Sequence, residues 1–151
     1  MMVPVKEIRI YVEGGGDSTA LQAQLRTGFD GLLKKQKQAA ASKGIRWNLT
    51  LCGTRNLAKD AFLNGLEKYA DALTILLVDA EAPFKAGTRD NVAHLKASDH
   101  WDLSKVDVNT VHLMIQCMEA WVVSDPEALS SYYGQYFSIN ALPQRLNLED
   151  E

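Results

Sequence analysis

Residues 8–19, IRIYVEGGGDST, decide the fold of this chain. Apolar residues at alternate positions in the first half are typical of a β-strand, which ends at Glu13. The three glycines that follow allow a sharp turn at positive φ. Asp17 and Ser18 are both good N-cap residues for a helix that begins near Thr19. The sequence therefore predicts two carboxylates, Glu13 and Asp17, at the carboxyl end of a strand, where open α/β sheets bind their ligands.

A glycine-rich turn between a strand and a helix is typical of phosphate sites, but two familiar versions do not fit. A P-loop ends in Gly-Lys-Ser/Thr, and no lysine follows these glycines. The dinucleotide fingerprint requires a third glycine where Thr19 stands, and two acids would repel a pyrophosphate. Two interpretations stay open: the acids hold a divalent cation, or Glu13 simply ends a strand and Asp17 simply caps a helix.

The composition is that of a soluble globular protein. The chain has 151 residues, 46% of them hydrophobic and 23% charged, which suffices for one core. A net charge of −3 argues against a generally basic nucleic-acid coat protein, although it leaves room for a local basic surface. No apolar run approaches the ~20 residues of a membrane span, the N-terminal residues lack the uninterrupted apolar region of a signal peptide, and the two cysteines lack CxxC spacing. We expect a single domain over residues 1–151, no membrane partner and a cytoplasmic location.

The rest of the chain alternates between helical and strand patterns. Residues 72–78, ALTILLV, are apolar throughout, which is typical of central parallel strands buried on both faces. The other expected strands cover residues 8–12, 46–52 and 111–117, and the expected helices begin near residues 19, 54, 89 and 118, with a restart at residues 124–127. This order predicts an α/β fold, a Rossmann-like sheet of roughly four mainly parallel strands with helices on both faces.

Several local features carry narrower predictions. The first helix is expected to run to Gly44, with an apolar stripe formed by Leu21, Leu25, Phe29 and Leu32. Between Arg26 and Arg46 lie six basic residues and one acid, which indicates a phosphate-contacting face or, as we favour, a solvated helix end. We interpret His94 and His100 as surface groups. On the second helix Ala58, Phe62, Leu66 and Tyr69 share a face, and Glu127 is placed to complete a capping box.

Acids follow three of the four predicted strands. Asp79 and Glu81 come directly after the third strand, and Glu119 closely follows the fourth. Because the carboxyl ends of parallel strands meet at one edge of the sheet, we expect these acids to lie with Glu13 and Asp17, Glu119 being an additional candidate. Carboxylates crowded in this way repel one another unless a cation neutralises them. Hard oxygen ligands favour Mg²⁺ or Mn²⁺ over zinc.

At this point a family resemblance is visible. Val12-Glu13-Gly14 with Asp17, followed by a buried strand that ends Asp79-x-Glu81, resembles the Toprim domain of topoisomerases, bacterial primases and OLD-type nucleases. The resemblance covers residues 8–119. The run MIQCMEAWVVSDPEAL resembles an uncharacterised bacterial family with a Toprim-like fold, some members of which are thought to serve in phage defence beside an ATPase. Two departures are that Glu81 stands where the family has aspartate, and that Pro83-Phe84 replaces a glycine.

The resemblance implies Mg²⁺-dependent phosphodiester hydrolysis. Glu13 would be the general acid or base, or a metal ligand, while Asp79 and Glu81 would hold Mg²⁺ (or Mn²⁺) with Asp17 as a further ligand. It also implies nucleic acid as substrate and an ATPase as partner, with the oligomeric state open. The alternatives are a non-catalytic Toprim-like module that binds a partner protein or a nucleotide, and a flavodoxin-like domain with an apolar cleft at this edge. Members of the closer family run on past this length, so we expect a domain truncated after Glu151.

Overall fold

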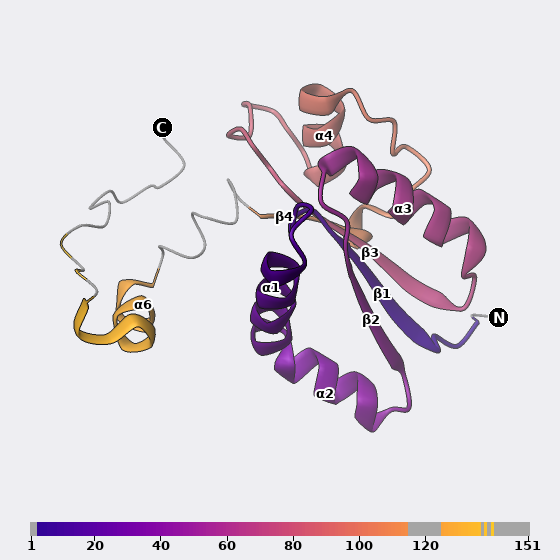
Figure 1. Cartoon of the computed structure of the whole chain (residues 1–151). Helices are drawn as coiled ribbons and strands as arrows, with labels where there is room; N and C mark the ends of the chain where they lie inside the picture. Colours follow the sequence, from indigo (N-terminus) through magenta and orange to yellow (C-terminus); the bar gives the residue numbers. More distant parts are fainter. Residues whose placement is uncertain (1–2, 115–124, 137, 139, 141–151) are drawn as a thin grey trace. The chain divides into compact units, whose positions relative to one another are not determined.

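In its described residues, 3–114, 125–136, 138 and 140, the computed structural model of the chain has one four-stranded parallel sheet in the order β2-β1-β3-β4 (Figure 1). The strands are β1 (Glu7–Val12), β2 (Arg46–Leu51), β3 (Ala72–Asp79) and β4 (Val111–Met114). The sheet confirms the predicted α/β class. The predicted continuation of the fourth strand to residue 117 lies outside the described residues.

Most of the described helices begin after a residue whose side chain caps them, whereas the helix that follows Leu33 has no side-chain cap. They are α1 (Thr19–Leu32), α2 (Lys34–Ser42), α3 (Arg55–Lys68), α4 (Asn91–Asp99) and α6 (Pro126–Tyr133), with short 3₁₀ segments η1 (Val108–Thr110) and η2 (Gly134–Tyr136). The Ser18 and Thr54 hydroxyls accept hydrogen bonds from Leu21 N and Leu57 N, both at 3.3 Å. Such caps satisfy backbone N–H groups that have no partner inside the helix.

The cap of α6 corrects one prediction. The Asp125 carboxylate accepts a hydrogen bond from Ala128 N at 3.0 Å, so Asp125 is the N-cap. Glu127 is therefore the second residue of the helix, whereas a capping box requires glutamate at the third. The prediction that Glu127 completes a capping box is wrong, although the restart of a helix at Pro126 is confirmed.

The chain divides into two compact units, Met1–Val78 with Lys105–His112 and Asp79–Ser104 with Leu113–Glu151. The first unit contains β1, β2, nearly all of β3 and the helices α1, α2 and α3. The second contains the turn that follows β3, and α4.

The order of the strands sets where a ligand is expected. β1 pairs in parallel with β2 on one side and with β3 on the other, and Val12 lies opposite both Leu51 and Leu77. Right-handed crossovers that run in opposite directions place α1 and α2 on one face of the sheet and α3 on the other, as seen in Figure 1. The connections after β1 and β3 leave toward opposite edges. Their adjacent carboxyl ends are therefore the topological switch point, the usual ligand site of open α/β sheets.

The two faces of β3 are buried to different extents. Thr74, Leu76 and Val78 of β3 are fully buried on the face that α3 covers, together with Ala58 and Phe62 of α3 itself. On the opposite face Ile75 and Leu77 are only half-buried. The prediction that this strand is buried on both faces is therefore right for the α3 face alone.

The helices on the other face of the sheet, α1 and α2, differ from their prediction in two ways. Within the expected apolar stripe Phe29 is buried, but Leu21 and Leu32 are 58% and 60% exposed. The expected single helix is interrupted at Leu33, which ends α1 and begins α2. This bend brings α2 against β2, where Ala40 is buried. The predicted end of the helix at Gly44, which has φ +69°, is confirmed.

The buried face of α3 differs from its prediction at one position near the end of the helix. Leu66 is exposed, and Gly65 is buried in its place against Tyr11 of β1. A Cβ atom at Gly65 would lie 2.6 Å from the Tyr11 hydroxyl oxygen. Only glycine allows the helix to approach the strand this closely.

Candidate functional site

Glu13 is a largely enclosed carboxylate directly after β1. Its backbone N–H donates to Leu77 O at 3.0 Å, which extends the pairing of β1 with β3 by one residue. Its Oε2 lies 3.1 Å from Nη1 of Arg55, and the two side chains are 14% and 13% exposed. The structure thus pairs the predicted catalytic acid with an arginine that sequence reasoning missed.

The glycine turn, Gly14–Gly16, brings these two residues together. Its three glycines have φ values of +131°, +90° and +49°. Gly14 and Gly53 exchange two backbone hydrogen bonds of 2.9 Å, so the turn after β1 is bonded to the turn after β2. At Gly15 a side chain would be strained by the positive φ, and its Cβ would lie 3.0 Å from Gln22 Cγ. Because α3 begins two residues after Gly53, this pairing of turns carries Arg55 to Glu13.

Arg55 is a cation at a helix N-terminus, where helices favour acidic residues. It is the first residue of α3, after the cap Thr54. A cation at a helix N-terminus is opposed by the positive end of the helix dipole. Pairing with the enclosed carboxylate of Glu13 compensates for this cost. An arginine in the first turn of a helix that follows a strand is the signal in the sequence that could have identified it.

The second unit contains the acidic turn, Asp79-Ala80-Glu81. Asp79 is the last residue of β3, and Glu81 is exposed with a φ of +59°, which is rare for a residue with a side chain. Ala80 between them is fully buried and hydrogen-bonded on both sides. Its N–H donates to Met114 O at 3.1 Å, and its carbonyl oxygen lies 2.9 Å from Nε2 of His94.

His94 corrects a further prediction. It is 4% exposed and its ring stacks on Phe84, with centroids 4.4 Å apart and planes inclined by 14°. The prediction of a surface group is therefore wrong for His94. It is right for His100, which is exposed and ends α4 in the left-handed conformation.

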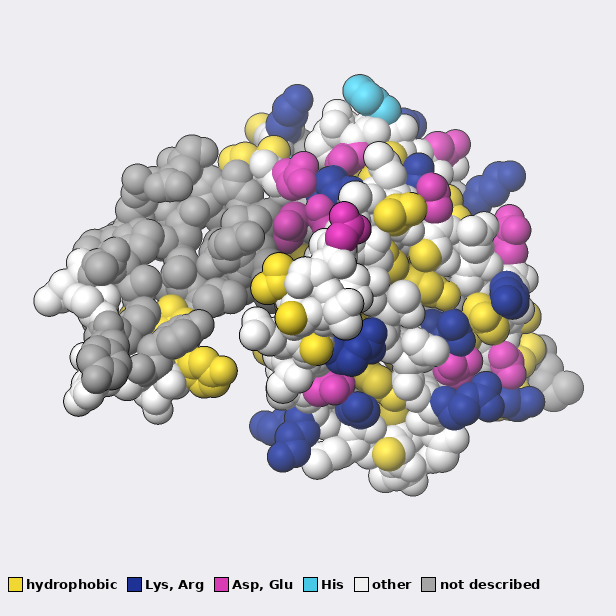
Figure 2. All heavy atoms as spheres, in the orientation of Figure 1, with side chains coloured by type: hydrophobic (Ala, Val, Ile, Leu, Met, Phe, Trp, Pro, Cys, Tyr) yellow, Lys and Arg dark blue, Asp and Glu magenta, His cyan; other side chains and the backbone are white. Residues whose placement is uncertain are grey.

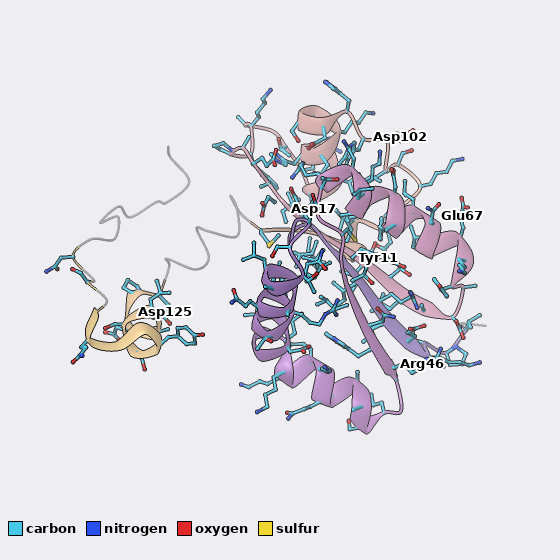
Figure 3. The ribbon with its side chains drawn as sticks, in the orientation of Figure 1. Tyr11, Asp17, Arg46, Glu67, Asp102 and Asp125 are labelled. Carbon is cyan, nitrogen blue, oxygen red and sulfur yellow. The ribbon has the colours of Figure 1, made fainter. Side chains whose placement is uncertain are left out.

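Two predicted acids remain, Asp17 and Glu119, and only Asp17 is among the described residues. Asp17 is exposed beyond the carboxyl end of β1, whereas Arg46 lies at the other end of the sheet (Figure 3). The cap of α1 is Ser18, so the interpretation of Asp17 as a helix cap is wrong. Glu119, the additional candidate, lies outside the described residues.

The acids suit a hard cation chemically, since carboxylate oxygens are the ligands that Mg²⁺ and Mn²⁺ prefer. Within the described part of the chain, however, no group of three or more His, Cys, Asp or Glu residues is arranged to hold a metal ion. Glu13 is already paired with Arg55 in this arrangement. The donor chemistry therefore fits, while the described residues do not by themselves complete a metal centre.

The basic residues between Arg26 and Arg46 are partly used inside the molecule. Arg26 Nη1 donates to Leu49 O at 2.7 Å, and Lys37 Nζ lies 3.2 Å from Asp30 Oδ1. On the face shown in Figure 2, Lys and Arg side chains stand in separate groups interspersed with acidic and apolar ones. These contacts favour a solvated surface over one continuous phosphate-contacting face.

The fold and these residues define a class of protein: a parallel α/β domain with acids after two adjacent central strands. The chain belongs to the family described as Domain of unknown function (DUF4276), which matches residues 12–151 and so includes every candidate acid. Searches of curated proteins and of solved structures gave no match. Among the helices that the structure describes, none is both long and apolar enough to cross a membrane.

Proposed function

We propose that this chain is a metal-dependent phosphodiester hydrolase of the Toprim type that acts on nucleic acid. The observation that carries the proposal is the environment of Glu13, an enclosed carboxylate at the carboxyl end of a central parallel strand, beside the switch point. The glycine turn follows it, where a ligand can approach the backbone closely. Asp79 and Glu81 follow β3, the strand that pairs with β1.

Each residue has a role in this proposal. Glu13 would move a proton at the reacting oxygen, and Arg55 orients its carboxylate. Asp79 and Glu81, with Asp17, would hold Mg²⁺ or Mn²⁺. When bound, the cation polarises the scissile phosphate and stabilises charge on its oxygens. Water is the nucleophile.

The second candidate is a non-catalytic Toprim-like module that binds a nucleotide or a partner protein such as an ATPase. Two observations favour it. The ion pair with Arg55 already neutralises Glu13, and the described residues gather no group of three metal ligands. Such a domain would keep the fold and its acids without needing a cation.

Cleavage of labelled single- and double-stranded DNA and RNA, with Mg²⁺, with Mn²⁺ or with a chelator, tests the proposal. We expect cleavage that requires the cation and falls by roughly 10²-fold or more in Glu13→Gln and Asp79→Asn. Glu67→Gln is the matched control, because Glu67 is exposed near the carboxyl end of α3 (Figure 3). Cleavage that persists equally in both variants would indicate another site. A folded wild type that cleaves none of the four substrates would favour the binding module.

A further inference from the structure

The acidic turn is held at its centre by a buried histidine fourteen residues further along the chain. A carbonyl oxygen can only accept hydrogen bonds, so Nε2 of His94 carries the hydrogen that Ala80 O accepts at 2.9 Å. Ala80 N–H is bonded to Met114 O at 3.1 Å. Both backbone groups of the residue between the two acids are therefore fixed, which restricts how far Asp79 and Glu81 can move.

The histidine is itself held in place. The backbone N–H of His94 donates to the backbone carbonyl oxygen of Asp90 at 3.0 Å. The Asp90 carboxylate caps α4 by accepting a hydrogen bond from Ala93 N at 2.8 Å. The ring stacks on Phe84, three residues after the acidic turn. The His94 imidazole thus makes two contacts with the segment that precedes α4. It donates a hydrogen bond to Ala80 in the acidic turn and stacks on Phe84 in the loop that follows.

The backbone at Glu81 indicates why such a clamp is needed. A φ of +59° costs an ordinary residue roughly 1 kcal/mol, and such conformations persist only where the surroundings enforce them. Strain of this kind is concentrated at functional sites. The clamped residue, Ala80, directly precedes the strained one.

We infer that His94 is a positioning residue for the acidic turn. Its hydrogen bond to Ala80 and its stacking on Phe84 fix the backbone from which the Asp79 and Glu81 carboxylates extend, and so set the affinity of the turn for a divalent cation. The cation rests on the proposed function, whereas the clamping of the turn stands on the hydrogen bonds and the ring contact alone. A histidine that merely filled the core beneath α4 would affect stability without affecting cation affinity.

Three variants of the full chain separate these roles. His94→Gln retains an N–H donor for Ala80 O and loses the ring, whereas His94→Phe retains a ring for Phe84 and loses the donor. Phe84→Leu removes the ring contact. Because Phe84 is 38% exposed, this variant should fold and still test the clamp if His94→Phe does not fold. His112→Gln is the control, because His112 is exposed.

Two readouts are required, both below the melting temperature of every variant compared. We expect amide hydrogen exchange in residues 79–84 of the metal-free protein to be about tenfold faster in His94→Phe, a few-fold faster in Phe84→Leu, and close to wild type in His94→Gln and His112→Gln. Calorimetric titration with Mn²⁺ should show about tenfold weaker binding to His94→Phe, in the range for residues that support metal ligands, with most of the affinity restored in His94→Gln.

Unchanged exchange in residues 79–84 of His94→Phe and Phe84→Leu would overturn the clamp. Faster exchange with wild-type Mn²⁺ affinity would overturn the positioning role and leave His94 as core packing. If the wild type and Asp79→Asn bind Mn²⁺ equally or not at all, the proposed cation site fails instead. The exchange measurement still decides whether His94 clamps the turn.

Discussion

The Glu13 carboxylate and the Arg55 guanidinium form a 3.1 Å ion pair between residues 42 positions apart, with side chains 14% and 13% exposed. Exposed ion pairs contribute little to stability because water screens them. For an enclosed pair the larger effect is the cost of leaving one charge without its partner. This pair therefore ties the carboxylate at the switch point of the sheet to the first turn of α3.

The first prediction is that Glu13 and Arg55 are energetically coupled. Arg55→Met should destabilise the protein strongly, and the same change should cost much less in a Glu13→Gln background, because the carboxylate that pairs with Arg55 is absent there. A double-mutant cycle by urea unfolding should give a coupling of about 1–3 kcal/mol. Losses that simply add would mean that the two side chains interact little in solution.

The second prediction concerns the contact between α3 and Tyr11. Gly65→Ala should destabilise by about 1–3 kcal/mol, because the new methyl group overlaps the Tyr11 ring and hydroxyl. Gly28→Ala is the matched control in another helix, where a Cβ meets nothing within 4 Å. It should stabilise by about 0.5–1 kcal/mol through the better helix propensity of alanine. Thermal unfolding of both variants checks this, and equal shifts would argue against the close approach at Gly65.

A third prediction separates backbone strain from carboxylate chemistry at Glu81. Glu81→Gly should be more stable than Glu81→Ala by about 1 kcal/mol, because glycine adopts a φ of +59° freely and alanine does not. Both variants lack the carboxylate, so both should lose Mn²⁺ affinity equally. Unfolding in urea gives the first comparison and calorimetry the second. An alanine variant as stable as the glycine variant would show that the turn relaxes out of the left-handed conformation.

The fourth prediction is a pH dependence. Burial raises the pKa of the Cys52 thiol above its usual value, although a hydrogen bond with the Val12 backbone partly opposes this. Between the unfolded pKa of about 8.5 and the raised folded pKa, the unfolded chain releases this proton first, so stability falls as pH rises. Below that range the contribution is fully present. Unfolding free energies at about pH 7.5 and pH 9.5 should fall more for wild type than for Cys52→Ala, and parallel losses would contradict the assignment.

Local chemistry was sufficient to predict the sheet and most helix starts. The Ser18 cap, the helix end at Gly44 and the apolar run of β3 each depend on only a few consecutive residues. They can therefore be predicted without knowing the tertiary contacts. Burial on each face was harder to predict. An apolar stripe such as the one from Leu21 to Leu32 predicts which side of a helix faces the sheet. It does not predict how much of that side the neighbouring elements bury.

The parts of the site that sequence reasoning missed depend on tertiary contacts. Arg55 reaches Glu13 because Gly14 and Gly53 pair across two turns, and nothing in either turn alone indicates the other. His94 is buried because the loop after the acidic turn folds back on α4. The acids could be predicted because each one directly follows a strand, whereas the residues that hold them come from distant parts of the sequence.

The most direct test of the central claim, that the acids after the central strands serve a cation, is the melting temperature of Asp79→Asn with and without Mn²⁺. If Asp79 is a ligand, the metal-free variant should melt at or above wild type, because repulsion among the acids is relieved. Mn²⁺ at about 100 times its dissociation constant should stabilise wild type by about 2.7 kcal/mol and the variant far less. A metal-free variant destabilised by about 1–3 kcal/mol, together with a wild type that does not respond to Mn²⁺, would contradict the claim and make Asp79 a structural hydrogen-bond acceptor.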